Sequence, residues 1–137
     1  MALVDLLSRM ALVSWHKTVA VSGALGSGKS EWVLNLAQGF RQRGDRPVTI
    51  ADIDITRDRG IKLPKGMLVS DANLIIKDPE IDIVVELVGG TEPARTFILN
   101  ALKAGKHVVT ANKSLLATKG QELFDTAQSC GRDLYFE

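Results

Sequence analysis

IDIVVELVGGTEPARTFILNALKAGKHVVTA, residues 81–111, is the stretch that decides the fold class of this chain. It begins with an unbroken apolar run, which is typical of a strand buried on both faces in the middle of a parallel sheet. Thr91, with Pro93 in the first turn, opens a helical period that ends at Gly105, and a second β-rich run occupies residues 107–111. A strand, a helix and a strand in this order predict one βαβ unit.

The same alternation of β-rich runs and helical periods continues on both sides of this unit. We expect further strands at residues 17–22, 48–53, 67–69 and 133–137. A helix after the first strand ends at Gly44, Asp71 caps a short helix that Asp78-Pro79 ends, and a last helix ends near Gly131. The sequence therefore predicts the α/β class: a three-layer, doubly wound, mostly parallel sheet of the Rossmann-like type, with strand order 3-2-1-4-5-6.

Length and composition are those of one ordinary globular domain. The 137 residues suffice for a single core, so we expect one α/β domain over residues 1–137. A net charge of +1 indicates no general attraction to nucleic acid or to membranes, and the single cysteine, Cys130, excludes an internal disulfide. These features fit a soluble cytoplasmic protein.

The first 16 residues, MALVDLLSRMALVSWH, are the nearest approach to a targeting segment. Asp5 and Arg9 interrupt their apolar run and no basic region precedes it, so we expect neither a signal peptide nor a membrane span. The helical spacing of the leucines predicts instead an extra amphipathic N-terminal helix. That helix and the last strand are each suited to homodimer formation.

The loop after the first expected strand reads GALGSGKS and fits the phosphate-binding pattern G-x-x-x-x-G-K-[ST] in full. Its glycines let backbone amides face phosphate oxygens, its lysine reaches the β- and γ-phosphates, and its serine hydroxyl can ligate magnesium. With ATP or a similar nucleotide and Mg²⁺ as the expected ligands, the predicted binding residues are Gly23, Ala24, Leu25, Gly26, Ser27, Gly28, Lys29 and Ser30. The dinucleotide pattern G-x-G-x-x-G, started at Gly26, fails because Glu31 takes its third glycine position.

Two aspartates are candidates for a catalytic or metal-binding role beside this loop. Residues 17–55 resemble the start of a P-loop NTPase, and in such families an acidic group beyond the second strand orients magnesium or the attacking water. Asp52 and Asp54 occupy the position beyond the second expected strand. The alternative interpretation is that they are only the solvated end of that strand.

Glu86 is a third candidate, because it ends the apolar run of the strand expected beside the loop. As an acidic group it could complete, with Ser30, the ligands of a magnesium ion. The alternative is structural, in that its carboxylate accepts hydrogen bonds from backbone amides near Gly89 and Gly90. The sequence leaves both interpretations open.

The second half of the chain carries a different set of motifs. Three of them are specific to one family, namely ELVGGTEPA, HVVTANKSLLA and DLYFE, at residues 86–94, 107–117 and 133–137. Through them, residues 61–137 resemble the NAD(P)-binding domain of homoserine dehydrogenase. The resemblance implies that Gly89, Gly90 and Thr91 lie beside the cofactor. It also implies that Lys113, in the motif TANK, is a catalytic residue near the nicotinamide and the substrate.

Two different resemblances in one chain lead to the hypothesis of an engineered chimera. In it a P-loop unit, residues 17–55, replaces the glycine-rich dinucleotide loop of a homoserine-dehydrogenase-like half, residues 56–137, after the extra helix at 1–16. The seam is expected within residues 54–62. Because the family continues into a substrate-binding domain beyond the position of Glu137, we expect no dehydrogenase turnover.

The function expected from this hypothesis is the binding of ATP-like nucleotide phosphates. One alternative is a slow magnesium-dependent NTPase that uses Asp52, Asp54 or Glu86. Another is a folded scaffold without activity. A third is retained NAD(P) binding, with Asp54 on a ribose hydroxyl or Arg57 near a 2′-phosphate, which we do not expect because the family's dinucleotide loop is missing.

Overall fold

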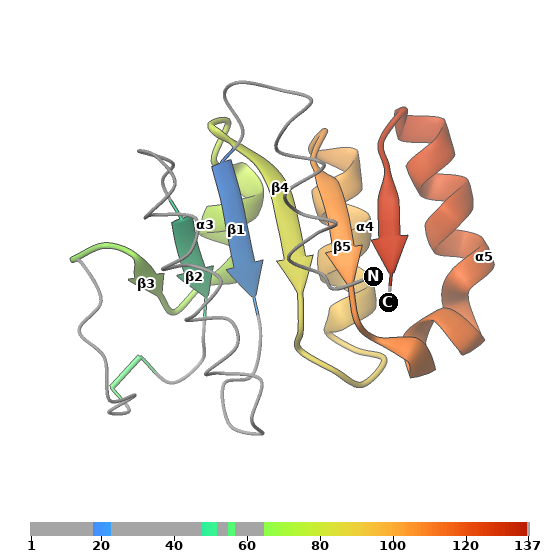
Figure 1. Ribbon diagram of the computed structural model, residues 1–137, viewed down its shortest axis with the longest axis horizontal. Coiled ribbons are helices and arrows are strands. Elements are labelled where there is room, and N and C mark those ends of the chain that lie inside the picture. The colour runs from blue at the N-terminus through green and yellow to red at the C-terminus, as the bar shows by residue number, and fades with distance from the viewer. Residues whose placement is uncertain (1–17, 23–47, 52–54, 57–64, 137) are drawn as a thin grey trace.

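Six described segments of the chain form one sheet in this computed structural model (Figure 1). The structure describes residues 18–22, 48–51, 55–56 and 65–136. The strand order is β3-β2-β1-β4-β5-β6, and every neighbouring pair is parallel. The parallel, Rossmann-like sheet expected from the sequence is therefore confirmed.

The strands are short, and each begins within one residue of its predicted start. They are β1 (Thr18–Ser22), β2 (Val48–Ala51), β3 (Leu68–Val69), β4 (Ile81–Glu86), β5 (His107–Thr110) and β6 (Leu134–Phe136). The fourth strand ends earlier than the predicted residue 88, because the backbone amide of Val88 turns toward the carboxylate of Glu86. The polar residue at the end of β4 thus stops the strand.

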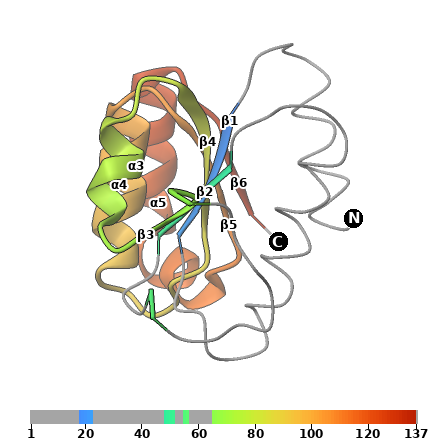
Figure 2. The same cartoon turned by 90° about the vertical axis from the view of Figure 1, so that its left-hand side faces the viewer.

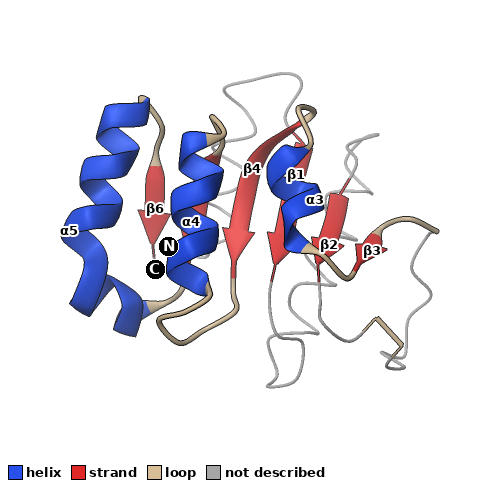
Figure 3. Ribbon diagram, turned by 180° about the vertical axis from the view of Figure 1, so that it is seen from behind, coloured by secondary structure: helices blue, strands red, loops and turns tan. Residues whose placement is uncertain are grey.

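Three described helices connect the later strands and lie on one face of the sheet. They are α3 (Ala72–Lys77), α4 (Ala94–Lys103) and α5 (Lys113–Cys130). Figure 2 shows all three on the same side of the sheet, and Figure 3 views the molecule from that side. Each helix links two parallel strands, as crossover connections require.

The ends of these helices follow from the local sequence. Asp71 caps α3, since its Oδ1 accepts a hydrogen bond from the backbone amide of Asn73 at 2.8 Å. Gly131 ends α5 with a φ of 61°, and Gly105 follows α4 with a φ of 82°, both in the left-handed region that favours glycine. The cap at Asp71 and the stops at the two glycines were all predicted from the sequence.

The middle of the sheet is buried on both faces. On the helix side, Val84 of β4 and Val108 of β5 belong to the main core cluster together with Ile98 of α4. On the other side, Ile83 and Val85 lie outside that cluster and are also buried. This confirms that the apolar run of β4 marks a central parallel strand.

Several predicted features lie outside the described residues. They are the N-terminal helix at 1–16, the glycine-rich loop at 23–30 and the helix expected to end at Gly44. Among the described helices, none is long and apolar enough to cross a lipid bilayer.

Candidate functional site

The carboxyl ends of three neighbouring strands meet at one edge of the sheet. β1, β4 and β5 end at Ser22, Glu86 and Thr110, and the register pairs Glu86 with both of the other two. β1 lies between β2 and β4, so the direction in which successive strands are added reverses between β1 and β4. In sheets of this type, ligands bind in the crevice outside the carboxyl ends of the strands at such a point.

Glu86 is buried at this edge, with an exposed fraction of 1%. Its Oε1 accepts hydrogen bonds from the backbone amides of Val88 at 2.6 Å and Gly89 at 3.3 Å. Its Oε2 accepts one from the hydroxyl of Thr110 at 2.7 Å. Burying a carboxylate costs free energy unless its oxygens are hydrogen-bonded, and here both oxygens have donors. These contacts tie β4 to the loop that follows it and to β5.

Asn112 makes a second link between the same two regions. Its Nδ2 donates to the backbone carbonyl of Gly90, in the loop after β4, at 2.6 Å. Its Oδ1 accepts from the backbone amide of Leu115 at 3.1 Å and so caps the start of α5. The backbone amide of Asn112 donates to the hydroxyl of Thr110 at 3.1 Å. The start of α5 is therefore held against the loop between β4 and α4.

The loop between β4 and α4 presents open backbone at this edge. Gly89 and Gly90 have φ values of 79° and 69°, which glycine adopts without the strain that a side chain would bring. Gly90 and Thr91 are exposed, and a Cβ placed on Gly90 would meet no heavy atom closer than the carbonyl oxygen of Glu92 at 3.9 Å. A ligand can therefore approach the backbone of this loop closely.

Lys113 is the first residue of α5, and it is exposed. A helix N-terminus carries positive partial charge, which disfavours a cation, and the first turn of α5 contains no acidic residue to offset it. The ammonium group of Lys113 therefore adds a full positive charge to the partial positive charge of the helix N-terminus, which is unfavourable for the stability of the fold.

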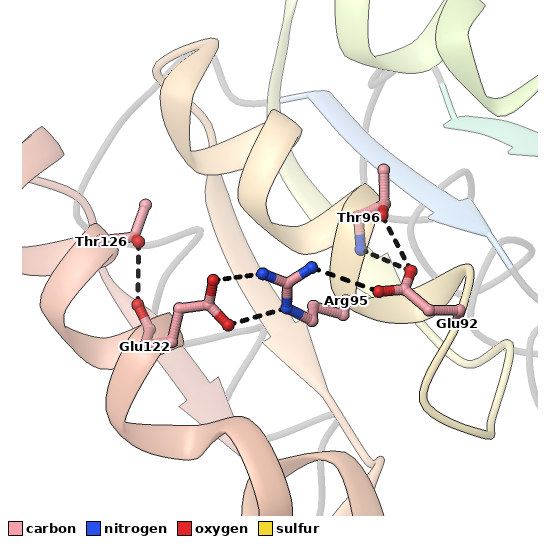
Figure 4. Close-up of polar contacts among 5 residues, drawn as sticks. All are labelled: Glu92, Arg95, Thr96, Glu122 and Thr126. Atoms are coloured by element: carbon pink, nitrogen blue, oxygen red, sulfur yellow. Dashed lines mark hydrogen bonds and ion pairs between the residues drawn. The ribbon is translucent and has the colours of Figure 1, made fainter.

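Arg95 joins α4 to α5 on the helix face (Figure 4). Its Nε donates to Glu122 Oε2 at 2.7 Å, its Nη2 donates to the other oxygen of Glu122, and its Nη1 donates to Glu92 Oε1 at 3.3 Å. The hydrogen bond from the Thr96 hydroxyl, with further help from Arg95, holds the pKa of Glu92 below its ordinary value. Hydrogen bonds from Arg95 lower the pKa of Glu122, and the same contacts raise the pKa of Arg95. The cluster fixes α5 against α4.

The site residues predicted from the sequence fall into two groups. Those of the second half, from Glu86 through Thr91 to Lys113, lie at the carboxyl edge just described. The loop residues 23–30, together with Asp52, Asp54 and Arg57, lie outside the described residues. Within the part of the chain that the structure describes, no group of three or more His, Cys, Asp or Glu side chains is arranged to hold a metal ion.

The structure shows the hydrogen bonds that the structural interpretation of Glu86 expected. Its carboxylate accepts backbone amides in the turn that leads into Gly89 and Gly90. Sequence reasoning missed Thr110 and Asn112, which complete its surroundings. A signal for Thr110 was present, because it is a polar residue at the end of an apolar strand, as Glu86 is.

Comparison with known proteins identifies one family over most of the chain. Residues 22–137 match the family model described as homoserine dehydrogenase, NAD binding domain. Homoserine dehydrogenase of Bacillus subtilis (strain 168) is 37% identical over 118 residues, which are 84% of this chain and 27% of that protein. Homoserine dehydrogenase of Corynebacterium glutamicum is 49% identical over 88 residues, which are 64% of this chain and 20% of that protein.

A solved structure agrees with these matches. The crystal structure of S. aureus homoserine dehydrogenase at pH 6.0 aligns with a TM-score of 0.70 and 33% identity, over 88% of this chain and 32% of that chain. The chain thus spans about a fifth to a third of the length of the proteins that it matches.

These matches correct the hypothesis of a chimera. The family model begins at Ser22, so it includes the loop at 23–30 and the expected seam at 54–62. A foreign P-loop unit would have left the match to begin near residue 61, where the resemblance to the family begins in the sequence. The interpretation of the chain as an engineered hybrid with a P-loop NTPase is wrong.

The prediction of ATP and Mg²⁺ as ligands is overturned by the same match, because the family model is that of a NAD binding domain. The magnesium roles of Ser30, Asp54 and Glu86 therefore have no support. The error has a physical cause. Loops for triphosphates and loops for dinucleotides both place glycines between a strand and a helix N-terminus, so that backbone amides can reach phosphate oxygens. Eight residues of that composition do not separate the two classes, whereas a match along most of the chain does.

Proposed function

The chain belongs to the homoserine dehydrogenase family, within its NAD-binding domain, and from this premise we propose that it binds NAD(P) at the carboxyl edge of β1, β4 and β5. The observation that carries the proposal is the reversal of strand order between β1 and β4, where folds of this type hold a dinucleotide. The residues at the edge fit such a ligand. The open backbone at Gly89 and Gly90 allows close approach, and no bulky side chain stands on Gly90.

The loop after β1 supplies two of the three glycines of the dinucleotide pattern. Gly26 and Gly28 occupy the first and second positions of G-x-G-x-x-G, and Glu31 takes the third. The first glycine allows the tight turn after the strand, and the second lets the backbone approach the pyrophosphate. We therefore assign Gly26 and Gly28 to the dinucleotide and give Lys29 no role in binding.

The acidic pair after β2 supplies a partner for the ribose. Asp52 directly follows β2 in the sequence, and Asp54 is two residues further on. A carboxylate at the end of this strand hydrogen-bonds the ribose hydroxyls of NAD and repels the 2′-phosphate of NADP. We propose that this pair favours NAD, and tighter binding of NADPH would point instead to Arg57.

For the complete protein we propose a nicotinamide-dependent reaction of homoserine, the substrate in the names of its relatives. The bound cofactor supplies or accepts the hydride, and the chain orients the cofactor and excludes water from it. Lys113 stands exposed at the same edge and carries an ammonium group that can hold or transfer a proton at the substrate oxygen.

Titration of the full chain with NADH and with NADPH, followed through the fluorescence of the reduced nicotinamide, tests the proposal. We expect saturable binding that NAD⁺ displaces and that ATP with magnesium does not. Lack of a saturable signal, or displacement by ATP at concentrations similar to those of NAD⁺, would contradict it.

Two variants in the same titration test which residues of the loop bind the ligand. Gly28→Leu places a side chain where the pyrophosphate must approach, so NADH binding should be lost. Lys29→Ala removes the residue that triphosphate binding would require and should leave NADH binding unchanged. Loss of NADH binding in both variants would count against this assignment.

A further inference from the structure

The hydrogen bonds at the carboxyl edge form one directional chain. The backbone amide of Asn112 donates to Thr110 Oγ1 at 3.1 Å, and Thr110 Oγ1 donates to Glu86 Oε2 at 2.7 Å. Because the hydroxyl accepts from an N–H group, its single proton is available for the carboxylate. The other oxygen of Glu86 accepts from Val88 and Gly89. The chain thus joins the loop after β4 to the connection between β5 and α5.

Asn112 closes this chain of contacts into a ring. Its side-chain amide donates to the carbonyl of Gly90 at 2.6 Å, while its side-chain oxygen caps α5. Figure 1 shows the connections after β4 and after β5 leaving the same edge of the sheet. Glu86 and Thr110 are 1% exposed and Asn112 is 7% exposed, so water does not compete for these groups. The two loops are therefore held in one relative arrangement.

The position of the ring in the fold limits what it can affect. Its members belong to β4, β5 and the residues that follow each of them. In a doubly wound sheet each half of the fold holds one mononucleotide of the ligand, and these strands belong to the second half. Movement of the ring would displace the backbone at Gly89 and Gly90 and the start of α5, because its hydrogen bonds run to these segments.

We propose that Glu86, Thr110 and Asn112 are positioning residues that set the affinity of this domain for the nicotinamide half of the dinucleotide. The inference rests on the proposed function and adds that different residues determine the binding of the two halves of the dinucleotide. The three residues orient the backbone against which the nicotinamide ribose and ring must fit, and the adenosine half binds independently of them.

Three substitutions break the ring at different points. In Glu86→Gln the oxygen can still accept the amides of Val88 and Gly89, but the nitrogen faces Thr110 as a donor, so the hydroxyl proton has no acceptor. Thr110→Val removes the hydroxyl and keeps the shape of the side chain. Asn112→Asp keeps the cap of α5 but turns an acceptor toward the carbonyl of Gly90.

Matched controls are available elsewhere in the chain. Thr110→Ser keeps the hydroxyl and should restore wild-type behaviour. Glu122→Gln and Thr126→Val repeat the same exchanges on α5, where the Thr126 hydroxyl donates to the backbone carbonyl of Glu122 at 2.8 Å, away from the carboxyl edge.

The experiment is isothermal titration calorimetry of the full chain with NADH and with ADP-ribose, which lacks the nicotinamide. We expect the three ring variants to bind NADH about tenfold more weakly, as when the binding-competent arrangement of the two loops falls to about a tenth of the population. Their affinity for ADP-ribose should equal that of the wild type. The three control variants should bind both ligands as the wild type does.

Two results would overturn the inference while leaving the proposed function intact. One is equal NADH affinity in the wild type and in the ring variants. The other is a parallel loss of NADH and ADP-ribose binding, which would mean that the ring only supports the fold. If the wild type binds neither ligand, the proposed function is itself wrong, and the inference fails with it. Circular dichroism identifies any variant that does not fold, and Asn112→Asp, which keeps its helix cap, then supplies the comparison.

Discussion

Thr110 and Glu86 are register partners on neighbouring parallel strands, and the hydroxyl of Thr110 donates to Glu86 Oε2 at 2.7 Å. The contact lies beneath the edge at which we propose that the cofactor binds. Because the carboxylate is buried, the arrangement of this edge depends on polar contacts as well as on apolar packing.

Thr110→Val should lower the free energy of unfolding by about 1–3 kcal/mol, because it leaves a buried carboxylate oxygen and the amide of Asn112 without a partner. Urea unfolding at neutral pH measures the change. Thr126→Val is the matched control, since its hydroxyl donates to the backbone carbonyl of Glu122 in the preceding turn, and it should change stability much less. Equal losses in both variants would show that the Glu86 contact adds nothing.

Lys113→Gln should raise the free energy of unfolding by roughly a few tenths of a kcal/mol, because it removes a cation from the N-terminus of α5. Lysine and glutamine have similar helix propensities, so the charge is the main change. Thermal unfolding at low and at high salt checks the prediction, since the gain should shrink when salt screens the charge. A loss of stability at low salt would show that Lys113 has a structural partner.

Lys106 lies at the opposite end of the sheet and is 3% exposed. Its ammonium donates to the backbone carbonyls of Asp78 at 2.5 Å and Ile81 at 2.7 Å. Burial lowers the pKa of this ammonium, against the opposing charges of Asp78 and Asp82. The folded state therefore binds fewer protons than the unfolded state at pH values between the lowered pKa and the ordinary value of about 10.4.

It follows that the wild type should gain stability relative to Lys106→Met as the pH rises through this range. Urea unfolding of both proteins at several pH values between neutrality and about pH 10.4 measures the difference. Parallel stability curves would show that Lys106 titrates alike in the folded and unfolded states.

Arg95→Leu should remove stability that depends on the ionised carboxylates of Glu92 and Glu122. Both groups have lowered pKa values, so their contribution is present above the ordinary pKa of about 4.3 and is lost as the pH falls through the lowered values. The difference in Tm between wild type and variant should therefore be largest near neutrality and shrink in acid. Arg95→Lys keeps the charge without the bidentate contact to Glu122, so its Tm should lie between those of the wild type and Arg95→Leu. A difference that persists unchanged in acid would assign the effect to packing.

Leu123→Ala should lower the free energy of unfolding by about 2–5 kcal/mol, because Leu123 of α5 is fully buried in the main core cluster. Leu74→Ala makes the same change in a residue of α3 that is 55% exposed, and it should cost less than about 0.5 kcal/mol. Similar losses at the two positions would contradict the packing of α5.

The order of elements could be read from the sequence because it depends on contacts between residues close together in the chain. The cap at Asp71, the stops at Gly105 and Gly131 and the apolar run of β4 each act within a few residues. The chemistry of the loop at 23–30 could not be read in the same way. Glycines between a strand and a helix serve triphosphates and dinucleotides alike, and only the family match over 22–137 separates them.

Local patterning by itself determined that this chain alternates strands and helices, and that β4 lies in the interior of a parallel sheet. Only the tertiary structure decided which polar groups meet. Glu86 and Thr110 are 24 residues apart in the chain, and Arg95 and Glu122 are 27 apart, yet each pair is joined by hydrogen bonds. The physical reason is that strand register and helix packing bring distant side chains together, and a buried carboxylate must take its donors from whichever groups the fold places beside it.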